Sequence, residues 1–212
     1  MARKALEYLH KLWYSIFKVK SGAKNMKNKA INRDIIENSY YMINLFDEEK
    51  KQKDISITNL KLQKLMYFLE AYYMVENPEE EELFNSEWSA WDYGPVNREL
   101  YNHYRKFGSM EITLNAIESE KGKDLPEINK KYIKKIYDLF GGFNAFDLVT
   151  LTHLDGSPWD KLYKNNEKLN IYDFGKLNDS IISKKETKEW FKNKFDFLFK
   201  NSRETENNGN VR

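Results

Sequence analysis

The segment TNLKLQKLMYFLEAYYMVEN, residues 58–77, is the strongest helix signal in the chain, and any fold must be built around it. Its large apolar residues recur at the spacing of one helix face: Leu62, Leu65, Met66, Leu69 and Tyr73. Thr58 can accept a hydrogen bond from a backbone amide of the first turn and so cap the helix. Because burial of a large apolar side chain contributes about 1.5–3 kcal/mol, we expect this helix to anchor the core.

Shorter helix signals surround this segment. Pro in a first turn, Ser or Asn as a cap and Gly as a stop mark the ends of the predicted helices. We expect helices over residues 33–50, from Pro95 to Gly108, from Pro126 to Gly141, after Asn144, after Ser157 and after the capping box Ser183–Glu186. Residues 87–91, EWSAW, indicate a short extended segment. The sequence therefore predicts a mainly α, compact single-domain helical bundle of about seven helices with at most a small β element.

Charge and apolar content together divide the chain into three parts. Residues 1–30 contain one acid, Glu7, and the basic residues Arg3, Lys4, Lys11, Lys18, Lys20, Lys24, Lys27 and Lys29, which makes +7. The net charge of the whole chain is +2, so the remaining residues carry −5. We expect a basic amphipathic extension and linker over 1–30, a helical domain over 31–200 and a disordered tail over 201–212. An acidic body with a basic arm is poorly suited to holding nucleic acid over its main surface.

Composition excludes several kinds of chemistry. The chain has no cysteine, so it has no disulfide and no thiolate metal site, which fits a reducing cytoplasm. No apolar run is long enough to cross a bilayer, and no secretory signal is present. The three histidines, His10, His103 and His153, lack metal-ligand spacing, and no phosphate-binding loop or nucleophile elbow occurs. We therefore expect no enzyme activity, no metal and no cofactor.

One pair of residues has a catalytic appearance. In THLDGSPW, a carboxylate at Asp155 could orient the imidazole of His153 for general-base work. We favour a structural interpretation, in which both residues lie in a turn between helices and Asp155 with Gly156 forms the bend.

Three motifs occur in a fixed order: ITNLKLQKLMYFLEAYYM, then AWDYGPV followed by LYNHYRKFG, then LTHLDGSPWDK. Together they resemble the Panacea-domain family, also called SocA-like and found in phage-associated proteins. The resemblance covers about residues 35–165 and leaves residues 1–30 outside it. One departure is Glu70, which stands where a small or amide residue is common. The resemblance implies an antitoxin that neutralises a toxin by direct protein contact and is usually encoded beside that toxin.

Alternatives to direct neutralisation follow from the same features. The chain could be a protease adaptor that delivers a bound partner for degradation, a DNA-binding autoregulator that uses the basic arm, or a hydrolase that uses His153 and Asp155. The apolar stripe of the arm, which includes Trp13 and Phe17, could dock on a partner, lie on a membrane, contact nucleic acid or pack on its own domain.

Candidate partner-binding residues are the aromatic and polar residues of the arm and motifs. Large aromatic residues first serve to close a core, and only those left at the surface can anchor a partner. The candidates are Trp13, Phe17, Trp88, Tyr93, Arg98, Tyr101, His153 and Trp159.

Overall fold

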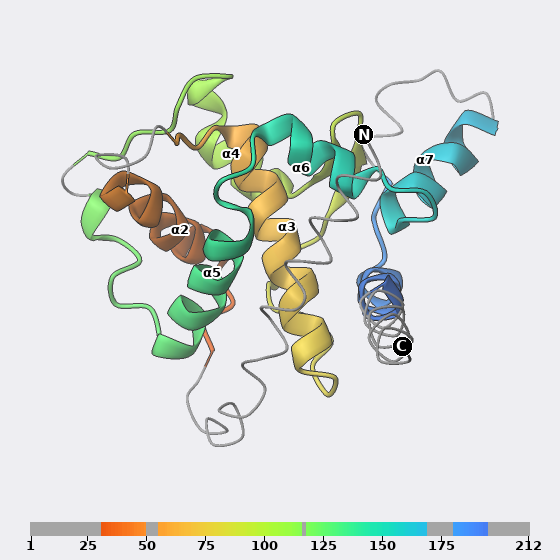
Figure 1. Ribbon diagram of the computed structural model, residues 1–212, viewed down its shortest axis with the longest axis horizontal. Coiled ribbons are helices and arrows are strands. Elements are labelled where there is room, and N and C mark those ends of the chain that lie inside the picture. Colours follow the sequence, from red (N-terminus) through yellow and green to blue (C-terminus); the bar gives the residue numbers. More distant parts are fainter. Residues whose placement is uncertain (1–30, 50–54, 116–117, 169–179, 195–212) are drawn as a thin grey trace, which may run out of the picture.

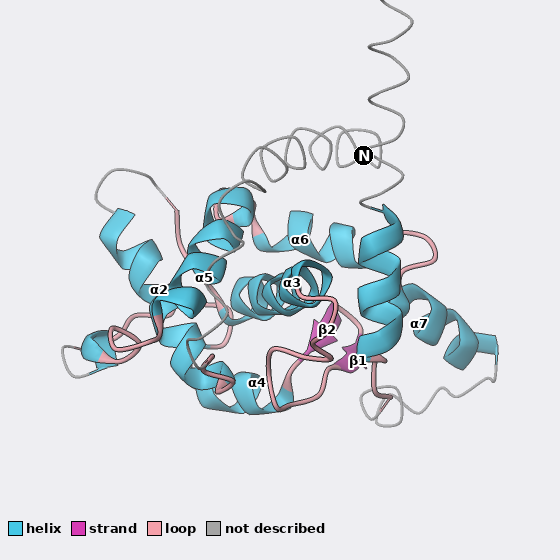
Figure 2. Cartoon of the chain, turned by 90° about the horizontal axis from the view of Figure 1, so that it is seen from below, coloured by secondary structure: helices cyan, strands magenta, loops and turns pink. Residues whose placement is uncertain are grey.

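Helix α3 (Asn59–Glu76) runs through the middle of the molecule, and the other elements are arranged around it (Figure 1). This computed structural model describes residues 31–49, 55–115, 118–168 and 180–194. Seen nearly end-on in Figure 2, α3 has α5 and α6 on one side and α4 with the small sheet on another. Within the described residues the protein is mainly α with one two-stranded sheet, which confirms the predicted fold class.

The remaining elements follow one another closely along the chain. The α-helices besides α3 are α2 (Ile35–Glu49), α4 (Arg98–Tyr104), α5 (Glu127–Phe140), α6 (Ala145–Thr152) and α7 (Pro158–Lys168), and residues 184–194 are also helical. Single 3-10 turns are η2 (Arg105–Phe107) and η3 (Glu118–Glu120), and the strands are β1 (Ser89–Trp91) and β2 (Gly94–Val96). No helix among these described segments is long and apolar enough to cross a membrane.

Burial on α3 extends well beyond the predicted apolar stripe. The five apolar residues of that stripe are buried, but so are Lys61, Gln63, Lys64 and Glu70. The cause is the central position of α3, which contacts α5, α6, α4 and β2 on different sides. A buried polar side chain is costly unless it is hydrogen-bonded, so each of these four residues has to find a partner on a neighbouring segment.

The predicted helix caps are confirmed at four starts, one of them Ser183, whose hydroxyl accepts from the amide of Glu186 at 3.2 Å. The side chain of Thr58 accepts from the amide of Lys61 at the start of α3, and that of Asn144 accepts from Asp147 at the start of α6. Ser157 accepts from the amide of Asp160 in the first turn of α7. Each cap satisfies an amide that has no partner within its own helix.

One predicted helix start is wrong. Pro95 lies in strand β2, opposite Ala90, and not in the first turn of a helix. Helix α4 begins three residues later at Arg98, because Asn97 caps it by accepting from the amide of Leu100 at 3.0 Å. Gly108 does end this helical stretch, with φ +56°, as predicted.

The small sheet is extended by a distant segment. β1 and β2 pair antiparallel, with Ser89 opposite Val96 and Trp91 opposite Gly94. On the other side of β1, the amide of Ile182 donates to the carbonyl of Trp88 at 2.7 Å. The residues just before the 184–194 helix are therefore held against the hairpin.

Candidate functional site

The three sequence motifs meet at the side chain of Lys64. This residue belongs to the first motif, on α3, and its side chain is fully buried. Its Nζ donates a hydrogen bond of 2.7 Å to the carbonyl of Pro95, which belongs to the second motif. Nearby lie Thr152 and His153 of the third motif, at the end of α6. Residues far apart in the chain thus form one cluster under the β1–β2 turn.

Gly94 is the point of closest approach in this cluster. Its φ is +92°, a conformation that residues with a side chain rarely adopt. A Cβ at this position would lie 2.5 Å from Thr152 Oγ1, 3.2 Å from Lys64 Nζ and 3.4 Å from His153 Nε2. Both the backbone conformation and the lack of space therefore require glycine in WDYGPV.

Gln63, the residue before Lys64, fixes the other end of the hairpin. Its side-chain oxygen accepts from the amide of Asn97 at 2.8 Å, and its side-chain nitrogen donates to the Asn97 carbonyl at 3.3 Å. Asn97 in turn caps α4. The Gln-Lys pair of LQKL thus binds the backbone on both sides of Val96 and positions the hairpin and α4 relative to α3.

Burial sets the electrostatics of the cluster. It lowers the pKa of the Lys64 amine well below its usual value, because the charged form loses its hydration. The pKa of His153 is lowered to about 4, first by burial and then by the nearby amine of Lys64, with Asp160 acting in the opposite direction. At neutral pH His153 is therefore neutral.

A stack of rings covers the cluster. The imidazole of His153 lies on the indole of Trp159 with centroids 3.6 Å apart and planes 1° from parallel, and Tyr163 stacks on the indole at 4.6 Å. The indole N–H of Trp159 donates to the carbonyl of Trp91 at 2.8 Å. His153 Nε2 and Trp91 Nε1 are buried and have no hydrogen-bond partner in the described part of the chain.

This arrangement does not form the catalytic pair considered from the sequence. Asp155 is exposed and pairs with Lys164 at 2.8 Å, so it does not orient His153. His153 ends α6, where its amide donates to the carbonyl of Val149, and Gly156 follows in the turn with φ +72°. The turn interpretation of THLDGS is confirmed. Among the described residues, no group of three or more acidic or histidine side chains could hold a metal ion.

The structure divides the predicted contact residues into buried and exposed ones. Trp88 and Trp159 are 2% and 5% exposed, so both belong to the core. Tyr93 and Tyr101 are 59% and 36% exposed, and Arg98 is also at the surface. His153 is half-buried under the ring stack, while Trp13 and Phe17 lie outside the described residues.

In the core, Trp88 is hydrogen-bonded to Glu70. The indole N–H of Trp88 donates to the carboxylate of Glu70, which also accepts from the amide of Phe84 and pairs with Lys184 at 3.3 Å. Burial raises the pKa of Glu70, while Lys184 and these hydrogen bonds act to lower it. Glu70, the residue that departs from the family pattern, therefore links the 184–194 helix to α3 through Lys184.

Two aromatic pairs remain at the surface beside the β1–β2 turn. Tyr93 contacts Phe146 on α6 edge-to-face, with centroids 6.3 Å apart, and Trp91 contacts Tyr101 on α4 at 4.9 Å. Phe146 is 65% exposed and was missed by the sequence reasoning. Its position could have revealed it, because it lies off the face on which Leu148, Leu151 and Thr152 are buried.

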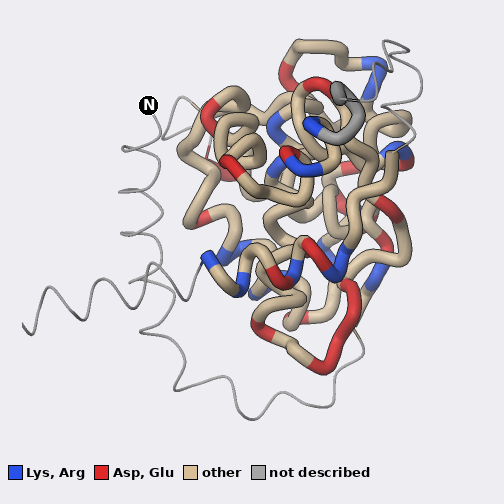
Figure 3. The backbone as a smooth tube through the Cα atoms, turned by 90° about the vertical axis from the view of Figure 1, so that its right-hand side faces the viewer, with Lys and Arg blue, Asp and Glu red and all other residues tan. Residues whose placement is uncertain are grey.

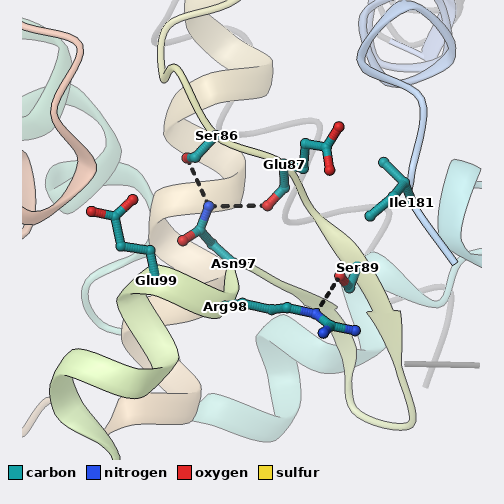
Figure 4. A pocket seen from close by; sticks show the side chains of 7 residues that line it. All are labelled: Ser86, Glu87, Ser89, Asn97, Arg98, Glu99 and Ile181. Atoms are coloured by element: carbon teal, nitrogen blue, oxygen red, sulfur yellow. Dashed lines mark hydrogen bonds between the residues drawn. The ribbon is translucent and has the colours of Figure 1, made fainter. Parts of the chain in front are cut away.

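A depression of about 400 Å³ lies on the other side of the hairpin (Figure 4). Asn97 donates to Ser86 Oγ at 2.8 Å along one wall, and Arg98 donates to Ser89 Oγ at 3.3 Å along another. Its remaining lining is mixed: Glu87, Glu99 and Ile181. No convergent set of catalytic groups lines the depression.

Comparison with known proteins confirms the resemblance drawn from the three motifs. Residues 62–160 match the family model described as "Antitoxin SocA-like, Panacea domain". The chain is 30% identical over 129 residues to a protein named Antitoxin SocA from Caulobacter vibrioides (strain NA1000 / CB15N). That match covers 55% of this chain and 65% of the relative. No solved structure matches the chain.

Proposed function

We propose that this chain, whose residues 62–160 belong to the SocA-like Panacea-domain family, is an antitoxin that neutralises a cognate toxin by direct protein contact. The observation that carries this proposal is that the matched residues contain the whole cluster around Lys64, from LQKL to SPW. The antitoxin role of the relative from Caulobacter vibrioides supports it.

The chemistry of the cluster favours binding over catalysis. Lys64 is fully buried, and the Nε2 of His153 is also buried, so neither of these two nitrogens is open to a substrate. Their contacts serve instead to fix the hairpin, α4 and α6 in one arrangement. A rigid scaffold of this kind lowers the entropic cost of association, because the contact surface is already ordered before the partner arrives.

The toxin is the product of a gene adjacent to the one that encodes this chain, and the two proteins meet in the cytoplasm. The basic extension over residues 1–30 adds to the encounter, since its charge of +7 can steer it to acidic groups. Neither a protease nor a nucleic acid is needed for neutralisation.

Reconstitution from purified components tests this function. The products of the adjacent genes are first expressed singly to identify one that arrests growth, and the arrest should disappear when this chain is co-expressed. The purified pair should then form a complex, and the toxin's activity should fall as this chain is added in the absence of any protease.

Two results separate the alternatives. Protection in cells with no inhibition of the purified toxin would show a protease adaptor in place of a direct inhibitor. Failure of the chain to bind or silence any adjacent product would overturn the antitoxin proposal itself.

A further inference from the structure

The most exposed aromatic pair of the domain is accompanied by two carboxylates. Tyr93 and Phe146, which contact each other, are 59% and 65% exposed. Asp92 precedes Tyr93 in the β1–β2 turn, and Asp147 follows Phe146 in the first turn of α6; both are exposed. Neither carboxylate forms a salt bridge with any described residue. We call these four residues the Tyr93–Phe146 face.

The segments that build this face contain no basic residue. Residues 88–97, which form the hairpin, have no Lys or Arg and one acid, Asp92. Residues 142–152, which lead into and form α6, likewise have none and one acid, Asp147. The acidic run after α3, a continuous red stretch in Figure 3, follows the C-terminal end of that helix and is not part of this face, which lies by Lys64 near the N-terminal end. A cation that approaches the face therefore meets little repulsion from these two segments.

We propose that the Tyr93–Phe146 face is the toxin-binding surface, and that it takes arginine or lysine side chains set among apolar groups. This inference rests on the antitoxin function proposed above. The ring faces can hold a cation or an apolar side chain, and the carboxylates of Asp92 and Asp147 supply acceptors for a guanidinium or an ammonium group. Exposed aromatic anchors of this kind provide most of the binding energy in protein interfaces.

The fold holds this face rigid from below. Tyr93 is adjacent to Gly94, which is wedged against Thr152 and Lys64, and Phe146 is on the same helix as Thr152. The turn and α6 are thus joined through the buried cluster, which holds together the two backbone segments that carry the rings. The contacts among the three motifs of this chain therefore have a direct consequence for binding, since they preorganise the surface that the toxin meets.

Four variants of the full chain test the proposal against matched controls. Tyr93→Ala and Phe146→Ala each remove one ring, and Met110→Ala removes a side chain that is equally exposed (67%) outside the face. The double change Asp92→Lys with Asp147→Lys reverses the charge of the face. Its control is Glu79→Lys with Glu81→Lys, which makes the same change of charge at two exposed positions after α3.

The measurement is the dissociation constant for the purified toxin identified above, taken at low and high salt. Each ring deletion should weaken binding by about 30-fold, which is typical of an anchor residue. The charge reversal should weaken it by a similar factor at low salt and by less at high salt, since salt screens exposed charges. Met110→Ala and the Glu79/Glu81 control should stay within about 3-fold of the unmodified chain.

The outcomes distinguish an error in the proposed binding surface from an error in the proposed function. If the unmodified chain binds the toxin and the face variants bind equally well with unchanged melting temperatures, the toxin-binding surface lies elsewhere and the antitoxin function stands. If the Glu79/Glu81 control weakens binding as much as the Asp92/Asp147 reversal, general charge and not this face attracts the toxin, and the inference is wrong. If the unmodified chain binds no adjacent gene product, the inference fails together with the function.

Discussion

Substitution of Gly94 by alanine should be among the most damaging single changes in the domain, although it adds one methyl group. Two costs combine at this position. The backbone φ of +92° disfavours any residue with a Cβ by roughly 1–2 kcal/mol. The new Cβ would also lie 2.5 Å from Thr152 Oγ1, and overpacking of a filled interior costs about 1–3 kcal/mol. We therefore expect Gly94→Ala to lower the free energy of unfolding by about 2–5 kcal/mol.

Substitutions at two other glycines separate the cost of the backbone conformation from the cost of the close approach. Gly156 has φ +72° and Gly108 has φ +56°, but a Cβ at either would meet nothing within 4 Å. Gly156→Ala and Gly108→Ala should therefore show the backbone cost alone, roughly 1–2 kcal/mol. The difference between Gly94→Ala and these controls gives the cost of the close approach.

The Thr152 hydroxyl donates a hydrogen bond to the Val149 carbonyl at 2.8 Å. It cannot move away from the new methyl group without weakening that bond. Removing that hydroxyl with Thr152→Ala should relieve part of the clash. The double variant Gly94→Ala/Thr152→Ala should thus be more stable than the sum of the single changes by about 1 kcal/mol or more.

The assay is urea unfolding followed by far-ultraviolet circular dichroism, with the slope compared among variants to establish that all unfold in the same way. A Gly94→Ala protein no less stable than Gly156→Ala would refute the close packing of the three motifs. Strict additivity with Thr152→Ala would refute the contact between the turn and α6. The same costs predict that Gly94→Val is less stable than Gly94→Ala, since a β-branched side chain is less tolerant of this backbone.

Further predictions concern His153, Glu70 and the N-terminal extension. His153→Ala should keep neutralisation at equal folded protein, which growth assays would show; loss of protection by a protein of unchanged melting temperature would revive a catalytic role. The pKa of His153 is about 4 when folded and 6.5 otherwise, so the unfolded state takes up the proton first as pH falls. Stability should then decline between pH 6.5 and about 4 by roughly 1–2 kcal/mol, allowing for partial exposure, and this decline should be absent in His153→Gln. Glu70→Ala leaves the buried indole N–H of Trp88 without its acceptor, and should cost about 2–4 kcal/mol in denaturant unfolding, with a smaller loss for Glu70→Gln. Deletion of residues 1–25 should leave the melting temperature unchanged and weaken toxin binding; an early-melting deletion would show that the extension packs on its own domain.

Helix existence was predictable from sequence because its signals are local. Thr58, Asn144 and Ser157 each cap the helix that follows, and a cap needs only the chemistry of residues two or three positions away. The predicted helix start at Pro95 was wrong because the local signal is ambiguous. A proline fits both a first helical turn and an edge strand, and only the pairing of Ala90 with Pro95 decides between them.

Burial of polar side chains was not predictable in the same way. Periodicity identified the apolar stripe of α3 but assigned Gln63 and Lys64 to no partner, since their hydrogen bonds reach residues some thirty positions ahead. The same holds for the surface. Phe146 and Tyr93 are adjacent in space only because α6 returns to the β1–β2 turn, a contact that no local pattern encodes.

The buried amine of Lys64 gives the clearest link between the buried polar side chains and the exposed surface. A methionine could fill its volume without any cost of desolvation, but it could not donate to the Pro95 carbonyl, which is held next to Gly94 by that bond. Lysine at this position therefore contributes more to the geometry of the turn than to the stability of the core. Since Tyr93 is attached to that turn and Lys64 is fully buried, we expect Lys64 to influence the proposed toxin-binding face only through the turn, as a positioning residue.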